Sequence, residues 1–157
     1  MGAEDGVEAF GFGAGDWVRL EAGLCRYGND TDTTTTPVVG DLNWIINKRR
    51  REEGGFLGAD IILDQLANGA PRKRVGIKPE GKAPAREHTP VLDGDGNEIG
   101  EITSGGFGPT VDGPIAMGYV AIEFAKPGTK IDLMVRGKAR PAEIVELPFA
   151  PHRYFRG

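Results

Sequence analysis

The length, composition and charge of this chain exclude several classes of protein. Its 157 residues can form one substantial domain, or a small domain and part of another, and its 39% hydrophobic and 27% charged residues are unlike a disordered chain or a coiled coil. A formal net charge of −4 and a pI near 5.2 argue against binding to nucleic acid, which needs a broad basic surface.

The sequence has no feature of an exported or membrane protein. No apolar run is long enough to cross a bilayer, and the acidic N-terminus is unlike a signal peptide. Cys25 is the only cysteine, which excludes an intrachain disulfide, and its apolar neighbours favour a buried, unreactive thiol. We therefore expect a soluble protein in a reducing compartment, either the bacterial cytoplasm or, in a eukaryote, the mitochondrial matrix.

The first seventy residues combine helical and extended patterns. Apolar residues at helical spacing predict helices at 16–24, with Asp16 as the N-cap, and at 58–68. The run of Thr and Asp between them, which ends at Pro37, predicts an ordered loop. Alternating apolar residues over 42–46 predict a short strand.

After Pro71 the pattern changes to short apolar runs separated by Gly and Pro. These runs predict an antiparallel meander of about six strands, with a hairpin turn at 93–97, where the sequence reads DGDGN. A closed or nearly closed barrel is expected, because strands without intervening helices must cover their own edges. The chain is thus predicted to be α+β, with residues 1–70 in one domain and 71–157 in an antiparallel β-barrel.

Two patterns that suggest metal binding have better explanations. Asp93 begins a calcium-loop pattern, but Glu98 and Ser104 stand where that motif requires Gly and a bidentate Glu. His88 and His152 lie far apart without nearby Cys or carboxylate spacing. We therefore predict no metal site.

Glu21 lies one helical turn after Trp17, on the apolar face of its predicted helix. A carboxylate facing a core needs a partner, because an unpaired buried charge is strongly destabilising. The favoured interpretation is a structural ion pair with one of the basic residues at 48–51. The alternative is contact with a bound ligand.

The basic clusters at 48–51 and 72–74 flank the expected domain boundary. Such clusters are usually solvated surface. Arginine side chains also suit carboxylates, however, so a ligand with a glutamyl tail or an acidic partner is the alternative. Strand alternation places Arg72 and Arg74 on one side of their strand.

A series of strings in order resembles one enzyme family over nearly the whole chain. It begins with LEAGLCRYGND at 20–30 and continues through TTPV, RVG, GEITSGGFGP, AMGYV, VRGK and LPF. These strings resemble the T-protein, or aminomethyltransferase, of the glycine cleavage system. The resemblance implies an enzyme that takes an aminomethyl group from the lipoyl arm of H-protein, releases ammonia and forms methylenetetrahydrofolate. It also implies that residues 1–70 correspond to the end of the folate-binding core and 71–157 to the C-terminal barrel.

The resemblance also supplies candidate site residues. Arg74 matches a family arginine near the active site, and Tyr154 matches a tyrosine of the C-terminal tail that contacts folate. Glu21, as a ligand for the pterin edge of tetrahydrofolate, and Arg50 are further candidates for the folate and substrate site.

The family's catalytic aspartate is not expected in this chain. It lies well before a family motif that reads GFGAGD here, at 11–16, with Gly15 in place of a folate-contacting arginine. We therefore expect the chain alone to be inactive, and to self-associate through helices whose apolar faces are exposed.

Two alternatives remain open. One is the folate domain of a dimethylglycine or sarcosine dehydrogenase, which shares this barrel. The other is a non-catalytic module that binds H-protein or another acidic partner through Arg72, Arg74 and the cluster at 48–51.

Overall fold

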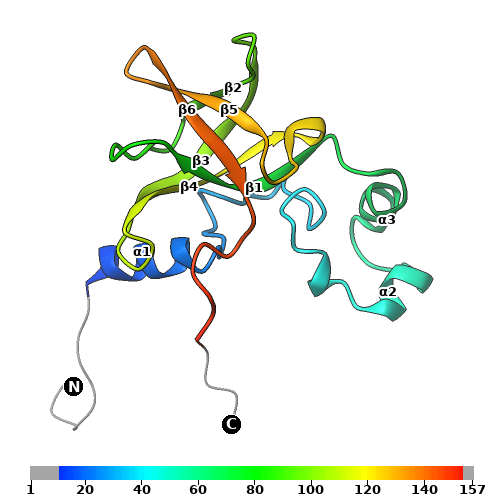
Figure 1. Cartoon of the computed structure of the whole chain (residues 1–157). Helices are drawn as coiled ribbons and strands as arrows, with labels where there is room; N and C mark the ends of the chain where they lie inside the picture. The colour runs from blue at the N-terminus through cyan, green and yellow to red at the C-terminus, as the bar shows by residue number, and fades with distance from the viewer. Residues whose placement is uncertain (1–10, 154–157) are drawn as a thin grey trace, which may run out of the picture.

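The fold is known from a computed structural model, which describes residues 11–153. Short helices occupy the first part of the chain and strands the remainder (Figure 1). The elements follow in the order α1 (Phe12–Glu21), η1 (Asn43–Ile45), α2 (Lys48–Glu53), α3 (Ala59–Asn68), β1 (Arg72–Pro79), β2 (Pro90–Leu92), β3 (Glu98–Gly108), β4 (Gly113–Ala121), η2 (Ile122–Phe124), β5 (Lys130–Val135) and β6 (Lys138–Val145).

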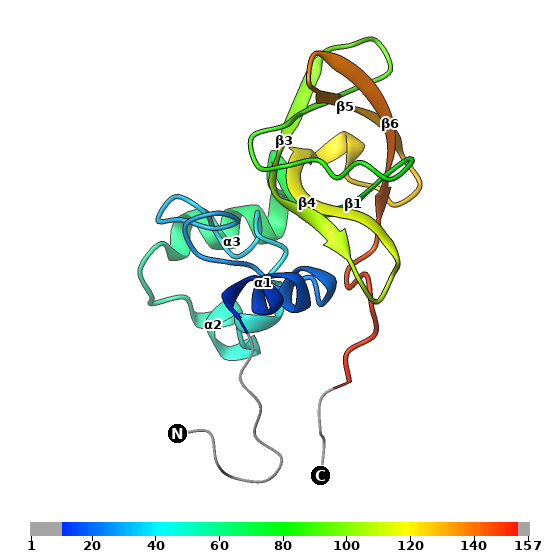
Figure 2. The same cartoon turned by 90° about the vertical axis from the view of Figure 1, so that its left-hand side faces the viewer.

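The six strands form a closed barrel in the order β1-β4-β3-β2-β5-β6. All neighbours are antiparallel, and β1 closes the barrel by pairing with both β4 and β6 (Figure 2). The hairpin turn at 93–97 joins β2 to β3. The expected α+β class with an antiparallel barrel is therefore confirmed. The division into 1–70 and 71–157 stays a prediction, although β1 begins at Arg72.

The interior of the barrel is aliphatic. Side chains alternate along each strand, so every second residue points inward. The inward set includes Ile77, Val91, Ile102, Leu133 and Ile144, all with no exposed surface. Burial of such a side chain is worth about 1.5–3 kcal/mol, so this core is the main source of stability for the barrel.

Both helices predicted from the sequence are present, but they begin and end at other residues than predicted. α1 begins at Phe12, so Asp16 lies inside the helix rather than at its N-cap, and its carboxylate pairs with Arg19 at 2.7 Å. α3 runs over Ala59–Asn68 and ends at Gly69, which has a φ of 89°. Neither α3 nor α2 has a buried residue, whereas α1 packs against β3 and β4. No helix within 11–153 is both long and apolar enough to cross a membrane.

The strand predicted at 42–46 is wrong. This segment forms the short helix η1, and the carbonyls of Asn43 and Ile46 accept hydrogen bonds from the side chain of Arg51. An extended segment is stable only beside a strand that pairs its backbone groups, and no described strand lies next to this one. The helix α2 was not predicted, although Asn47 caps it by accepting from the Arg50 backbone N–H at 2.9 Å.

Candidate functional site

Arg74, the first predicted site residue, is fixed where two loops from the first part of the chain meet β1. Its side chain is only 4% exposed. The guanidinium donates from Nε to the Gly40 carbonyl at 2.8 Å and from Nη1 to the Gly23 carbonyl at 2.9 Å. Nη1 also lies 3.0 Å from the sulfur of Met117 on β4. Charged donors to buried carbonyls hold a side chain firmly, so the cation has one well-defined position.

The remaining amino group of Arg74, Nη2, makes no hydrogen bond to any residue within 11–153. Arginine carries five N–H donors, so this group keeps two for another acceptor. Arg74 also lines a cavity of about 290 Å³ together with Asp41, Lys73 and Leu147. A carboxylate or carbonyl oxygen is the partner that a fixed guanidinium suits best.

Arg72 lies on the same side of β1, as the alternation predicts. Its guanidinium carbon is 5.0 Å from the ring centroid of Tyr119, and Tyr119 stands opposite Arg74 in the β1–β4 register. The Tyr119 hydroxyl donates to the backbone carbonyl of Asp30 at 2.6 Å. Arg72, Arg74 and Tyr119 thus lie on one side of the barrel, which we call the Arg74 wall.

Asp30 anchors the first part of the chain to this wall, and the sequence analysis did not find it. Its carboxylate is wholly buried and accepts from Arg19 Nη1 at 2.6 Å, from the Thr103 hydroxyl at 2.6 Å and from the Arg26 backbone N–H at 2.9 Å. Arg19 lies on α1 and Thr103 on β3, so the carboxylate connects helix, loop and barrel. Asp30 lies within the string that carries the family resemblance, but nothing in the letters marks it as buried.

Burial raises the pKa of two groups near Arg74, one on this wall and one in the loop that follows α1. It raises the pKa of Tyr119 from 10.0 to about 12. Burial also raises the pKa of the Cys25 thiol, an effect that the nearby Arg74 cation opposes. Since the thiolate is the reactive form of cysteine, a raised pKa agrees with the expected unreactive thiol.

The raised pKa of Tyr119 predicts a loss of stability at high pH. Below pH 10 both the folded and the unfolded chain carry the proton, and the neutral phenol contributes fully. As pH rises from 10 through about 12 the unfolded chain ionises first, so the free energy of unfolding should fall. Urea unfolding at a series of pH values checks this, and Tyr119→Phe should lack this part of the decline. Equal declines in both proteins would contradict the assigned burial.

The ion pair predicted between Glu21 and the basic residues at 48–51 is wrong. Glu21 is 6% exposed, and its carboxylate accepts from the Thr110 backbone N–H at 2.6 Å, the Thr110 hydroxyl at 2.7 Å and the Val111 backbone N–H at 3.3 Å. These donors belong to the turn between β3 and β4, which packs on α1. Neutral donors thus satisfy both carboxylate oxygens and tie α1 to the barrel.

The C-terminal tail leaves β6 beside Arg74 and runs to the C-terminal end of α1. The Ala150 backbone N–H donates to the Glu21 carbonyl at 3.0 Å. Leu147 lies over Gly23 and Gly76, and a Cβ on Gly76 would stand 2.9 Å from a methyl carbon of Leu147. Tyr154, the second predicted site residue, lies outside the described residues, so its approach to Arg74 stays a prediction.

Replacing Gly23 with alanine should loosen this junction. Gly23 has a φ of 67°, which costs a residue with a side chain about 1–2 kcal/mol, and its new Cβ would stand 3.2 Å from Leu147. We expect a loss of about 1–3 kcal/mol in the free energy of unfolding, measured with urea. Gly94→Ala is the control, because its φ is ordinary and nothing lies within 4 Å of its Cβ. Equal stability of the two variants would contradict the packing described.

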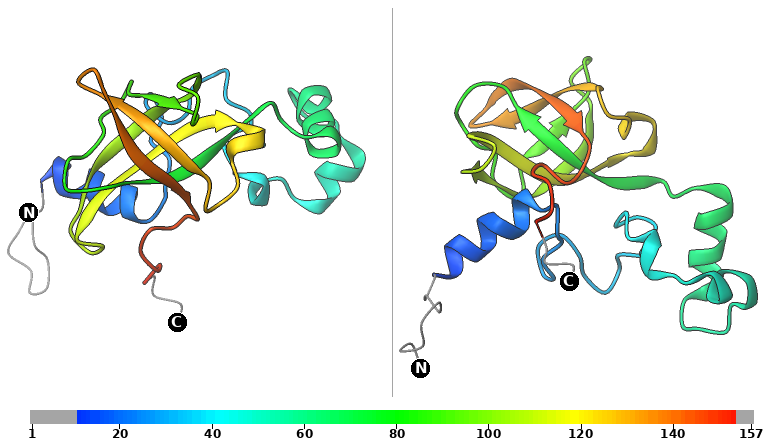
Figure 3. Two further views of the ribbon diagram at one scale, coloured as in Figure 1. Left: turned by 45° about the horizontal axis from the view of Figure 1, so that its top comes forward. Right: turned by 60° about the horizontal axis from the view of Figure 1, so that its bottom comes forward.

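Arg50, a further candidate, does not join Arg74. It lies on α2, where its Nη1 donates to the Gly54 carbonyl at 3.3 Å. Figure 3 shows α2 and α3 standing apart from the barrel. The structure therefore places Arg72 and Arg74 on one side of β1, with Leu147 of the tail beside Arg74, and does not bring Arg50 to them.

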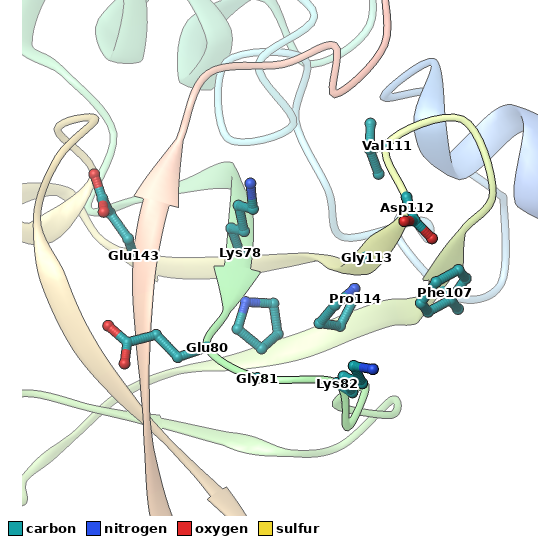
Figure 4. A pocket seen from close by; sticks show the side chains of 11 residues that line it. Lys78, Glu80, Gly81, Lys82, Phe107, Val111, Asp112, Gly113, Pro114 and Glu143 are labelled. Carbon is teal, nitrogen blue, oxygen red and sulfur yellow. The ribbon is translucent and has the colours of Figure 1, made fainter.

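A larger cavity lies elsewhere on the barrel. It has a volume of about 690 Å³ between the end of β1, the β3–β4 turn and β6. Figure 4 shows Lys82, Phe107 and Pro114 on one side of it. None of the predicted site residues lines it, and of its charged residues Glu143 is already paired with Lys130 at 2.6 Å. Size alone therefore does not mark it as the functional site.

Comparisons with known proteins agree with this barrel. Residues 72–150 match the family model "Glycine cleavage T-protein C-terminal barrel domain". The chain is 49% identical over 154 residues to the mitochondrial aminomethyltransferase of Flaveria anomala and 48% identical to that of Pisum sativum, covering 98% of this chain and 38% of each relative. The crystal structure of the glycine cleavage system aminomethyltransferase T from Bartonella henselae superposes with a TM-score of 0.86 at 45% identity, over 90% of this chain and 39% of that one.

The chain thus spans about two-fifths of the length of the relatives that it matches. The family model covers the whole barrel, from the first residue of β1 to beyond β6. The protein belongs to the glycine cleavage T-protein family and corresponds to its C-terminal portion.

Proposed function

We propose that this chain forms the C-terminal part of a tetrahydrofolate-dependent aminomethyltransferase of the glycine cleavage system. The complete enzyme would take the aminomethyl group from the lipoyl arm of H-protein, release ammonia and form methylenetetrahydrofolate. The observation that carries the proposal is the 49% identity to an aminomethyltransferase over 98% of this chain. Such agreement along both the helical part and the barrel favours this enzyme over a dehydrogenase that has only the folate domain in common.

In this proposal the Arg74 wall is the side of the folate site that the barrel supplies. The guanidinium is held by the carbonyls of Gly23 and Gly40, and its Nη2 group keeps donors for a ligand oxygen. A buried cation whose position is already fixed loses little freedom when a ligand binds. Tyr154 would complete the wall from the tail. When bound, tetrahydrofolate supplies the nitrogen atoms that accept the one-carbon unit.

The wall has a binding role rather than a catalytic one in this proposal. The buried carboxylate of Asp30 beside it accepts from Arg19, Thr103 and the Arg26 backbone N–H, and these contacts tie α1 and its following loop to the barrel, which is a structural role. The catalytic carboxylate is therefore assigned to the part of the enzyme that this sequence does not match. We expect this chain alone to catalyse no aminomethyl transfer.

A chimera tests the proposal. This chain replaces the matching 154 residues of the Pisum sativum aminomethyltransferase, and the rate of methylenetetrahydrofolate formation is measured with aminomethyl-loaded H-protein and tetrahydrofolate. We expect activity from the chimera and none from this chain alone. A chimera that folds cooperatively and binds H-protein, yet forms no product, would contradict the proposal.

A further measurement addresses the non-catalytic alternative. H-protein is titrated into this chain alone at low and at high salt. If the chain binds H-protein strongly at low salt but not at high salt, and the chimera is inactive, the results would favour a non-catalytic binding module. Such a module would bind H-protein through Arg72 and the cluster at 48–51.

A further inference from the structure

The cavity of about 690 Å³ lies where the strands β1 and β4 separate at one end of the barrel. The two strands pair as far as Ile77 and Ala116, and β1 then continues beside β6 alone, with Pro79 opposite Ala142. The mouth of a β-barrel is a common position for a ligand site, and such sites have volumes of about 300–1,000 Å³. The position and the size of this cavity therefore both suit a ligand.

Two opposed prolines end the ladder between β1 and β4. The N–H groups of the even-numbered residues Arg74 and Glu80 donate to carbonyls outside β4, so the odd-numbered residues of β1 face β4. Two residues beyond the last pair, the register would bring Pro79 opposite Pro114. A facing pair of this kind exchanges two N–H···O bonds, and proline has no N–H. The strands therefore separate at this point.

The separation leaves two backbone acceptors at the cavity. By the same alternation the carbonyls of Pro79 and Pro114 point across the gap toward each other, and neither residue can offer the other an N–H. Backbone carbonyls in folded proteins are normally paired with donors. A ligand that enters the gap must therefore bring hydrogen-bond donors with it.

The side chains at the gap form a flat apolar surface. Phe107 stands opposite Pro114 in the β3–β4 register, so Pro79, Pro114 and Phe107 form one row across three strands. Both prolines are buried, whereas the ring of Phe107 is 41% exposed. Figure 4 shows the rings of Phe107 and Pro114 side by side. This row offers a stacking surface for a planar group.

Two carboxylates lie on opposite sides of this row. Glu80 directly follows β1 and Asp112 lies in the β3–β4 turn, and Figure 4 shows the two side chains on either side of the cavity. No cationic nitrogen within 11–153 lies within 4.0 Å of either carboxylate. Of the two lysines in the lining, Lys78 stands opposite Glu143 in the β1–β6 register, and Lys82 lies at the rim. The carboxylates of Glu80 and Asp112 thus remain available to a cationic ligand.

We infer that this cavity, which we call the proline cleft, is a binding site for a guanidinium group. A guanidinium is planar and carries only donors, so it suits the carbonyls of Pro79 and Pro114. The same group pairs with carboxylates such as Glu80 and Asp112 and is attracted to the face of an aromatic ring such as Phe107. Its source is either free arginine or an arginine side chain of another protein. The inference goes beyond the proposed function, because the proline cleft shares no residue with the Arg74 wall.

Amide NMR spectra of this chain test the inference with two probes. Nα-acetyl-L-arginine N-methylamide resembles an arginine within a protein, and L-arginine represents the free amino acid. The backbone amides of Gly81 and Gly113 line the cleft and are the reporters, and that of Gly94 in the β2–β3 turn is the control. We expect saturable shifts confined to the cleft, with a Kd of about 1 mM for a group of this size. Tighter binding of the blocked probe would assign the site to a protein partner, and tighter binding of L-arginine to the free amino acid.

Variants of the two carboxylates localise the contact. Asp112→Asn and Glu80→Gln should each weaken binding of the preferred probe about five- to tenfold, because each removes a charge and keeps the size of the side chain. Both residues are exposed, and asparagine tolerates the φ of 49° at position 112, so the fold should be unaffected. Asp95→Asn, which removes an exposed carboxylate outside the cleft, is the matched control and should leave the affinity unchanged.

Several results would overturn the inference. Equal binding of the corresponding blocked lysine or blocked alanine would show that the cleft does not select a guanidinium. Preferred binding of blocked aspartate would make the cleft an anion site that depends on Lys82. Full affinity in both carboxylate variants would place the contact elsewhere, and unchanged Gly81 and Gly113 signals well above the expected Kd would exclude a site. None of these measurements involves folate or H-protein, so the proposed function is tested separately by the chimera.

Discussion

Replacing Asp30 with alanine should lower the free energy of unfolding by about 3–5 kcal/mol. The substitution removes a buried carboxylate that accepts from both Arg19 and Thr103, and it leaves the partly buried guanidinium of Arg19 with the more exposed Asp16 as its carboxylate partner. A domain of this size is stable by only about 5–15 kcal/mol, so the effect is a large fraction of the whole. Urea unfolding followed by circular dichroism measures it.

Asp95→Ala is the matched control for this prediction. Asp95 is exposed in the turn between β2 and β3, and only its backbone N–H takes part in a hydrogen bond, to Asp93. Its loss should change stability by no more than about 0.5 kcal/mol. If Asp30→Ala were equally mild, the buried link between α1, the loop and β3 would be wrong.

Replacing Arg74 with alanine should have the second largest effect, a loss of about 2–4 kcal/mol. The carbonyls of Gly23 and Gly40 would lose a charged donor inside the protein, where water does not readily replace it. Arg72→Ala is the comparison, because Arg72 lies on the same face but is exposed. Its guanidinium lies over the ring of Tyr119, a contact worth about 0.5–1 kcal/mol. Thermal and urea unfolding of the two variants should separate a structural arginine from a surface one. Similar losses would mean that Arg74 is not the buried anchor described.

The barrel could be predicted from the sequence because its signals are local. Each of these signals involves only a few neighbouring residues: the short apolar runs, the Gly and Pro between them, and the DGDGN turn. Strands joined in this way have no helices to cover their edges, so a closed barrel is expected. α3 was predicted for the same reason, since its apolar spacing and the terminal Gly69 lie within one short segment.

Partners distant in sequence could not be predicted in this way. The helical spacing placed Glu21 on an apolar face, but it could not show that the turn at Thr110 packs there. Asp30 has no local feature that separates it from the exposed Asp32 two residues later. The strand predicted at 42–46 is wrong because alternating apolar residues show only that a segment could form a strand. A strand also needs a neighbouring strand to pair its backbone groups, and that neighbour cannot be read from the segment itself.

The candidate site is supported to different degrees. The position of Arg72 and Arg74 on one face followed from strand alternation and is confirmed. The role of Arg74 toward folate comes from the family resemblance and stays a proposal, as does that of Tyr154. The structure adds a physical reason for Arg74, namely a fixed guanidinium with one amino group that makes no hydrogen bond to the residues from 11 to 153.

The dependence of the chimera's rate on tetrahydrofolate concentration tests the central claim, that the Arg74 wall binds folate, most directly. Arg74→Lys keeps the charge and a donor for the Gly23 and Gly40 carbonyls but removes Nη2. The account predicts that KM for tetrahydrofolate rises about 10- to 100-fold in this variant, while KM for H-protein is unchanged. An unchanged KM for tetrahydrofolate in a fully folded Arg74→Lys chimera would contradict it.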